Sequence, residues 1–178
     1  MIKLLDILRE NKILVPRRSP EERQKNYQIA LQKKIQQYIK DGGKGNLDLE
    51  NTPIQSLPPG LKVRGNLYLK GTLIQSLPPG LEVKGSLYLY NCKNLKSLPD
   101  GLKVRGLLDL ERCKNLKSLP NGLKVGGGLN LENTLIQSLP DDLEVGGDLN
   151  LINTPISKKY TEEEVRKMAP GVKGYIYL

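Results

Sequence analysis

A unit of 20 or 21 residues recurs along this chain and restricts the possible fold more than any other feature. Successive units start 20, 20, 21, 21 and 20 residues apart, each at a glycine: Gly45, Gly65, Gly85, Gly106, Gly127 and Gly147. A fixed period of this length is typical of solenoids, in which each unit buries its apolar face only by stacking on its neighbours. The sequence therefore predicts a stack of short repeats.

Apolar and polar residues alternate within each repeat before a turn that contains proline. Between positions 61 and 69 the apolar residues follow a period of two on either side of Gly65. This period places them on one face of a strand that bends at the glycine. Residues 78–80 are Pro-Pro-Gly. Because proline lacks the N–H that a sheet needs, this triplet predicts the turn that returns the chain to the next strand.

The same repeat contains the pattern Leu67-x-Leu69-x-x-Thr72-x-Ile74-x-x-Leu77-Pro78. This pattern resembles the leucine-rich repeat family, with its L-x-L-x-x-N/C/T-x-L-x-x-L-P motif, and is closest to the short bacterial and phage repeats. The resemblance covers residues 45–157 and implies an α/β, mainly β, solenoid of about six to seven parallel strands. Threonine or cysteine fills the ladder position, where we expect inward bonds to loop backbone: Thr52, Thr72, Cys92, Cys113, Thr134 and Thr154.

Helix signals precede the repeats. Residues 1–11 predict a short amphipathic helix, and Ser19, Pro20 and Glu22 predict the capped start of a second helix that ends at Gly42-Gly43. We expect its apolar stripe to pack over the first repeat as a cap, and the stripe contains Tyr27, Leu31, Ile35, Tyr38 and Ile39. A helix that binds a partner instead is the alternative.

One domain with a cap at each end is the organisation that we expect for this length. The N-terminal helical cap covers residues 1–44, and the leucine-rich repeats cover residues 45–157. A C-terminal cap over residues 158–178 contains a short helix and a final strand. The capping box from Thr161 to Glu164 predicts the start of that helix.

Residue types that carry out chemistry are scarce in this chain. It contains no histidine, which excludes Ser-His and Cys-His pairs and imidazole metal ligands. Two cysteines are too few for a thiolate zinc site, and the glycines recur with the repeat instead of forming a phosphate-binding loop. We therefore expect a protein that is not an enzyme, with no catalytic residues, no metal and no cofactor.

The N-terminal residues and the hydropathy predict a cytoplasmic protein. No run of about 18 apolar residues is present, so we expect no membrane span. Charges interrupt the apolar part of residues 1–10, unlike a secretion signal. We expect Cys92 and Cys113 to be reduced. The N-terminal helices and the repeat type are also similar to proteins encoded by bacteriophages, and this resemblance implies a viral or bacterial source and a host cytoplasm.

Outward strand positions bring tyrosines and acidic residues together on neighbouring repeats. We predict a partner-binding site that consists of Tyr68, Lys70, Tyr88, Tyr90, Asp109 and Glu111. The resemblance implies that such positions line a concave surface on which family members usually bind proteins. Tyrosine is favoured at interface centres, and the acids favour a partner with a basic or mixed surface. Tyrosine placed there only for its strand propensity is the alternative.

Cations gather at the N-terminus and along another outward row. Residues 1–44 contain 11 Lys and Arg against 5 Asp and Glu, which supplies +6 of the net charge of +9. A basic surface can bind nucleic acid because phosphate contacts dominate that affinity. The candidate polyanion site consists of Arg17, Arg18, Lys33, Arg64, Lys84 and Arg105. A solvated basic face is the alternative.

Three function classes remain open. The first is a scaffold that binds another protein through its outward strand face, and the phage resemblance permits an inhibitor or a host-factor binder as one version. The second is a polyanion or nucleic-acid binder. The third is a structural component of a larger particle, joined through its ends.

Overall fold

The computed structural model describes residues 19–178. The chain divides between Lys34 and Ile35 into two compact units, and helix α2 (Pro20–Lys40) crosses this boundary. The predicted helix at residues 1–11 lies outside the described residues, as do Arg17 and Arg18. Within residues 19–178, no helix has the length and the apolar character needed to cross a membrane.

The ends of α2 follow the predicted capping signals. The N–H of Glu22 donates to Ser19 Oγ over 3.1 Å, and the N–H of Ser19 donates in return to Glu22 Oε2 over 3.0 Å. Two glycines, Gly42 and Gly43, adopt left-handed φ angles after the last turn, a conformation that glycine adopts without a steric penalty. In the predicted apolar stripe, Leu31 and Ile35 are buried, whereas Tyr27 and Ile39 are 46% and 40% exposed. Packing of this helix over the first repeat stays a prediction.

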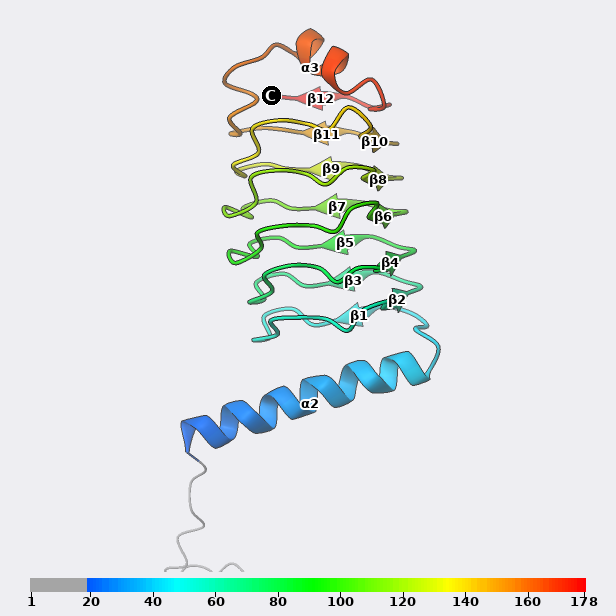
Figure 1. Ribbon diagram of the computed structural model, residues 1–178, viewed down its shortest axis with the longest axis vertical. Coiled ribbons are helices and arrows are strands. Elements are labelled where there is room, and N and C mark those ends of the chain that lie inside the picture. The colour runs from blue at the N-terminus through cyan, green and yellow to red at the C-terminus, as the bar shows by residue number, and fades with distance from the viewer. Residues whose placement is uncertain (1–18) are drawn as a thin grey trace, which may run out of the picture. The chain divides into compact units, whose positions relative to one another are not determined.

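From residue 45 onward the chain forms a parallel β-solenoid, and we call each repeat a rung (Figure 1). A seven-stranded sheet contains one strand from each rung: β1 (Leu47–Asp48), β3 (Leu67–Tyr68), β5 (Leu87–Tyr88), β7 (Leu108–Asp109), β9 (Leu129–Asn130), β11 (Leu149–Asn150) and β12 (Ile176–Tyr177). A five-stranded sheet contains β2 (Lys62–Val63), β4 (Glu82–Val83), β6 (Lys103–Val104), β8 (Lys124–Val125) and β10 (Glu144–Val145). The predicted solenoid of about six to seven parallel strands is confirmed.

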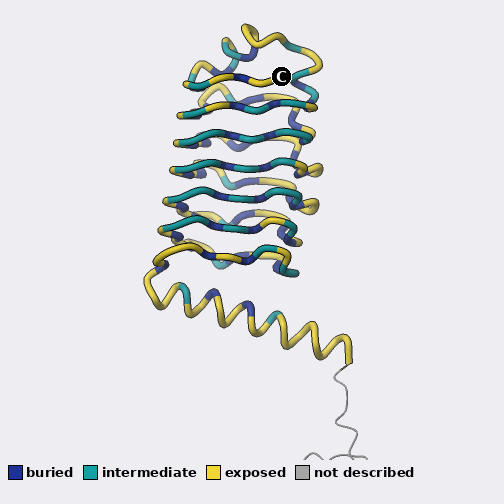
Figure 2. The backbone as a smooth tube through the Cα atoms, turned by 180° about the vertical axis from the view of Figure 1, so that it is seen from behind, coloured by how far each residue is buried: buried dark blue, intermediate teal, exposed yellow. Residues whose placement is uncertain are grey.

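The prediction of a single bent strand in each repeat is wrong. Each full rung contains two short strands in two sheets, because the chain turns at residues such as Arg64 and Gly65. The turn separates the strand at 62–63 from the strand at 67–68 while the inward alternation of side chains continues through it. Buried and partly exposed residues therefore alternate along the strands that face the viewer in Figure 2.

A column of glycines runs along this turn from rung to rung. Each glycine N–H donates to the carbonyl of the glycine one rung before it over 2.9–3.0 Å, through Gly45, Gly65, Gly85, Gly106, Gly127, Gly147 and Gly174. From Gly65 onward, a Cβ added at these positions would lie between 2.4 and 3.0 Å from a backbone atom of the preceding rung. Side chains cannot occupy that space, so the column explains why the repeats from Gly65 onward begin with glycine.

The core is a narrow stack of aliphatic side chains with one polar ladder. Leu67 and Leu69 are fully buried, as are the leucines at the same positions of the other first six rungs, whereas Leu178 on the last rung is exposed. The hydroxyl of Thr72 donates to the carbonyl of Leu69 over 2.7 Å, and the thiol of Cys92 donates to the same carbonyl over 3.0 Å. The predicted inward bonds of the ladder residues are therefore confirmed. Both cysteines are buried free thiols.

The C-terminal end contains helix α3 (Glu162–Met168) and the final strand β12. Thr161 caps the helix, and its capping box with Glu164 is present as predicted. Val165 of this helix is fully buried, and β12 pairs in parallel with β11.

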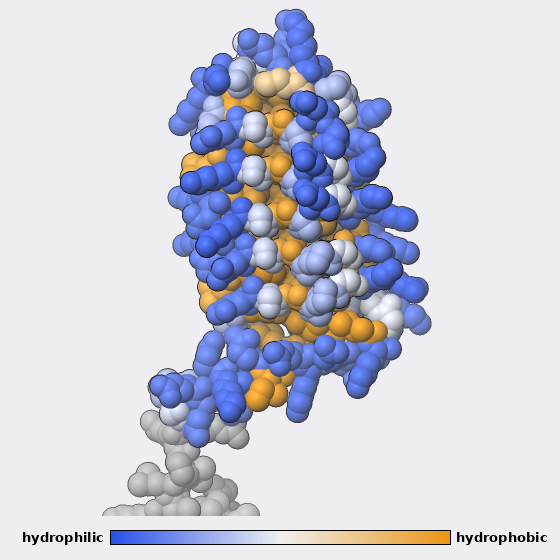
Figure 3. Space-filling view, in the orientation of Figure 1, coloured by the Kyte–Doolittle hydropathy of each residue, from blue (hydrophilic) through white to orange (hydrophobic). Residues whose placement is uncertain are grey.

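On the face seen in Figure 3, strongly hydrophilic side chains flank a strip of apolar and weakly polar atoms.

Replacing Gly127 by alanine is expected to destabilise the solenoid by about 2 kcal/mol, because overpacking forces the backbone to move. The new Cβ would lie 2.9 Å from the carbonyl carbon of Gly106. Gly128 is the matched control, since its nearest atom to an added Cβ lies 3.3 Å away. Thermal or urea unfolding compares the two variants. Equal destabilisation by Gly127→Ala and Gly128→Ala would contradict the role of the glycine column.

The two thiols are expected to make the fold sensitive to alkali. Burial raises the pKa of Cys92 above its ordinary 9.0 and that of Cys113 to about 12. Since the unfolded chain loses these protons at lower pH than the folded chain does, stability falls as the pH rises from about 9 towards 12. The variant Cys92→Thr/Cys113→Thr introduces threonine, which occupies this ladder position on the other rungs. Melting temperatures between pH 7 and pH 10.5 should fall less steeply for this variant, and equal slopes would contradict the assignment.

Candidate functional site

The register of the seven-stranded sheet places one outward side chain of every rung in a single column. Parallel pairing aligns Asp48, Tyr68, Tyr88, Asp109, Asn130, Asn150 and Tyr177. We call this row the Tyr68 column. Neighbouring strands lie about 4.8 Å apart, so adjacent members of the column can touch. The chemistry of the face changes from rung to rung although the backbone does not.

Two members of the Tyr68 column form a stacked aromatic pair. The rings of Tyr68 and Tyr88 have centroids 4.9 Å apart and planes within 2° of parallel. The amide of Asn66 donates to the hydroxyl of Tyr68 over 3.0 Å. This bond orients the ring of Tyr68 towards the start of its strand. Both tyrosines are half-buried, so the pair presents an aromatic surface that is already ordered.

A hollow of about 440 Å³ opens beside this pair, and we call it the tyrosine hollow. It is lined by Glu50, Tyr68, Lys70, Tyr88, Tyr90 and Asp109. Five of the six residues predicted to bind a partner therefore lie around one depression. The sixth, Glu111, is not part of the lining and pairs instead with Arg112 Nε over 3.3 Å. Glu50 belongs to the hollow, although the predicted site did not include it.

Tyr90 lies between two cations of the chain itself. Lys70 Nζ lies 5.1 Å from the centroid of its ring, and Arg112 Cζ lies 5.6 Å from the same centroid. Arg112 Nη1 also donates to the Tyr90 hydroxyl over 2.7 Å. A cation over an aromatic face is attracted by the electron-rich ring. Tyr90 is therefore held in a fixed position by its own neighbours.

Arg112 is a contributor that the sequence analysis did not select. Its φ is 59°, in a left-handed position that other rungs fill with asparagine: Asn51, Asn91, Asn133 and Asn153. Asparagine tolerates this conformation better than arginine does. Arg112 therefore costs backbone strain that an asparagine would lessen, and strained residues are common at functional sites. Alignment of the six repeats could have revealed it as the one long side chain at that position.

Asp109 has a structural role that was not predicted. Its Oδ1 accepts the N–H of Glu111 over 3.0 Å and the amide of Asn130 over 3.2 Å. Asp48 and Asn130 accept the N–H two residues further on in the same way. These short side chains therefore close the turn after the strand. Within residues 19–178, no hydrogen bond is made by Asp109 Oδ2.

Burial, with added repulsion from neighbouring carboxylates, raises the pKa of two acidic residues on this face. Burial raises the pKa of Asp109, and repulsion from Glu132 adds to the shift while Lys70 opposes it. Burial also raises the pKa of Glu111, followed by repulsion from Glu132 and from Asp109. The outward side of the first six rungs of this sheet contains six carboxylates, at Asp48, Glu50, Asp109, Glu111, Glu132 and Asp148. Two cations, Lys70 and Arg112, oppose them, which leaves a net charge of −4.

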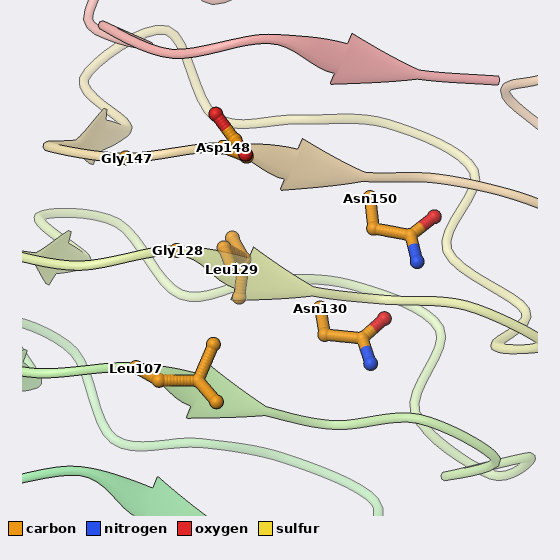
Figure 4. A pocket seen from close by; sticks show the side chains of 7 residues that line it. All are labelled: Leu107, Gly128, Leu129, Asn130, Gly147, Asp148 and Asn150. Carbon is orange, nitrogen blue, oxygen red and sulfur yellow. The ribbon is translucent and has the colours of Figure 1, made fainter.

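A second hollow of about 470 Å³ lies further along the same face, around Gly128 (Figure 4). The side chains of Leu107, Asn130, Asp148 and Asn150 surround the glycine, where other rungs have a side chain. Both amides are engaged: Asn130 bonds to Asp109, and Asn150 bonds to Glu132 over 3.2 Å. A ligand in this hollow would therefore be held by shape complementarity more than by hydrogen bonds to these two amides.

The predicted polyanion residues do not all belong to one described surface. Arg64, Lys84 and Arg105 are exposed on successive rungs beside the five-stranded sheet. Lys33 is exposed on α2 in the other compact unit, and Arg17 and Arg18 lie outside the described residues. Part of the adjacent row is neutralised, since Lys62 pairs with Glu82 at 3.1 Å and Lys124 pairs with Glu144.

Comparisons with protein-family models, with curated proteins and with solved structures find no match for this chain. Among residues 19–178, no group of three or more histidine, cysteine, aspartate or glutamate side chains is placed to hold a metal ion. The candidate site is consequently defined by its own geometry. It consists of the stacked tyrosines, the tyrosine hollow and the acidic residues around it.

The variant Asp109→Asn is expected to stabilise the fold at neutral pH by about 0.5 kcal/mol, a value that allows for solvent screening. The folded-state pKa of Asp109 is raised above 3.8, so the ionised form disfavours folding and its cost grows as the pH rises through that window. Asparagine keeps the Oδ1 acceptor, as it does at Asn130 and Asn150. Urea unfolding at pH 3 and pH 7 measures the difference.

The reverse exchange, Asn130→Asp, is the control. It adds a carboxylate beside Asp109 and should lower stability at pH 7 more than at pH 3. A stabilising effect of Asp109→Asn that is equal at both pH values would show that ionisation of Asp109 is not its cause.

Proposed function

We propose that this chain is a non-enzymatic scaffold that binds another protein through the outward face of its seven-stranded sheet. The observation that carries the proposal is the stacked pair of Tyr68 and Tyr88 beside the tyrosine hollow. Ordered aromatic side chains supply large contact area at low entropic cost, and tyrosine is enriched among the residues that dominate interface energies. A rigid sheet under them adds preorganisation.

The charge of this face supports a protein partner over a polyanion. A net charge of −4 on the outward side of the sheet repels phosphate groups, although the whole chain has a net charge of +9. Charge complementarity steers encounter and selects partners. The partner surface that fits this face is consequently basic or mixed.

A polyanion binder that uses Arg64, Lys84 and Arg105 is the second candidate. These three cations repeat along successive rungs and are exposed, and like charges at strand spacing repel one another unless an anion lies between them. Nucleic acid or another polyanion would supply that charge. This candidate uses a different surface from the first, so the two can be separated by mutation.

We further propose that the chain is a member of the leucine-rich repeat family and acts in the cytoplasm of a bacterial host. The repeat pattern, its buried leucine positions and the inward ladder support the family. The resemblance to phage repeats supports a phage-encoded inhibitor or host-factor binder as the specific version of the scaffold.

The test compares two sets of variants of the full chain. Tagged protein is incubated with bacterial lysate divided into nuclease-treated and untreated halves, and recovered partners are quantified. The variant Tyr68→Ala/Tyr88→Ala is expected to reduce recovery of a protein partner at least tenfold, about 1.4 kcal/mol of binding free energy. The variant Arg64→Glu/Lys84→Glu/Arg105→Glu should leave it unchanged in both halves.

Tyr175→Ala is the matched control, because Tyr175 is 72% exposed at the end of the stack and lies outside the Tyr68 column. Nuclease-sensitive recovery that only the charge reversal abolishes would establish the polyanion candidate instead. Loss caused by Tyr175→Ala alone would point to assembly through the end strand and contradict the proposal.

A further inference from the structure

The first four residues of the Tyr68 column follow the order acid, tyrosine, tyrosine, acid. Asp48 is aligned with Tyr68 on one side of the stacked pair, and Asp109 is aligned with Tyr88 on the other side. The pair uses one face of each ring for the stack. The remaining face of Tyr68 is therefore directed towards the rung of Asp48, and that of Tyr88 towards the rung of Asp109.

Tyr90 shows how this protein surrounds a tyrosine ring when its own residues complete the arrangement. Its ring has a cation from the preceding rung, Lys70, and a cation from the following rung, Arg112. Arg112 in turn pairs with the carboxylate of Glu111. The order around this ring is therefore aromatic face, cation and carboxylate, which is the order that electrostatics favours.

Among residues 19–178, no cation lies over the ring of Tyr68 or Tyr88, since Lys70, which also lines the tyrosine hollow, lies over Tyr90 instead. The ring face of an aromatic side chain is electron-rich, so a carboxylate beside it adds negative charge to negative charge. Asp109 uses only Oδ1 for the turn and the Asn130 amide, and within the described part of the chain Oδ2 accepts no hydrogen bond. The tyrosine hollow opens at this point, lined by both Tyr88 and Asp109.

We propose that the partner is a protein segment with basic side chains, and that an arginine or lysine of this segment lies between the ring of Tyr88 and the carboxylate of Asp109. The inference rests on the proposed function and names the chemistry of its partner. The cation stacks on the aromatic face and donates to Oδ2. Planar guanidinium suits both contacts better than ammonium does, so arginine is preferred to lysine.

The experiment selects binders for the full chain from an unbiased library of displayed random dodecapeptides. Binding is repeated on Tyr68→Ala/Tyr88→Ala, and peptides lost on this variant are sequenced. We expect these peptides to be enriched in arginine. One is then synthesised with each arginine replaced by citrulline, which keeps the shape and removes the charge, and affinity is measured by fluorescence anisotropy.

Citrulline is expected to weaken binding at least tenfold, and Asp109→Asn, which retains the Oδ1 acceptor, should weaken the arginine peptide by a similar factor. Tyrosine-dependent peptides that are neutral or acidic would overturn this inference while the proposed function stands. Absence of any tyrosine-dependent peptide would overturn both. Self-association of the chain that Asp109→Asn and Arg105→Glu each abolish would also overturn the inference, because a second copy would then supply the cation.

Discussion

The hydrogen-bonded glycine column is the constraint on which the rest of the solenoid depends. Each glycine N–H meets the preceding glycine carbonyl at 2.9–3.0 Å, at a turn that leaves no room for a Cβ. This contact fixes where every rung turns from the five-stranded to the seven-stranded sheet. Since side chains alternate with a period of two, a shift of one residue would turn the leucines outward. The glycine column therefore fixes the register of the strands and keeps the leucines in the core.

A fixed register turns differences between repeats into local sites. The backbone repeats almost unchanged, whereas the outward residues do not. Tyrosine stands at the column position on two neighbouring rungs, arginine replaces asparagine at one left-handed position, and glycine at 128 leaves a hollow where other rungs have a side chain. The acidic, aromatic face is thus formed by residues that lie about 20 positions apart in the sequence. The repeat period brings them together, although their residue types alone would not indicate that they are neighbours.

The periodic features could be predicted from the sequence, and the features of single rungs could not. Inward leucines, the threonine ladder and the grouping of Tyr68, Tyr88 and Asp109 all follow from the repeat period and a period-two strand. The division into two sheets depends on the angle of the turn at Gly65, which alternation does not encode. The bonds of Asp109 and the strained φ of Arg112 depend on backbone geometry after the strand.

Tyrosine NMR of the full chain tests the central claim, that the Tyr68–Tyr88 pair with its flanking carboxylates is the recognition surface. The chain has eight tyrosines and no Phe, Trp or His, so its aromatic spectrum contains tyrosine signals alone. Addition of an arginine-containing partner peptide should shift the ring signals of Tyr68 and Tyr88 and leave those of Tyr27 and Tyr160 in place. Shifts confined to tyrosines outside the Tyr68 column, with Tyr68 and Tyr88 unchanged, would contradict the account.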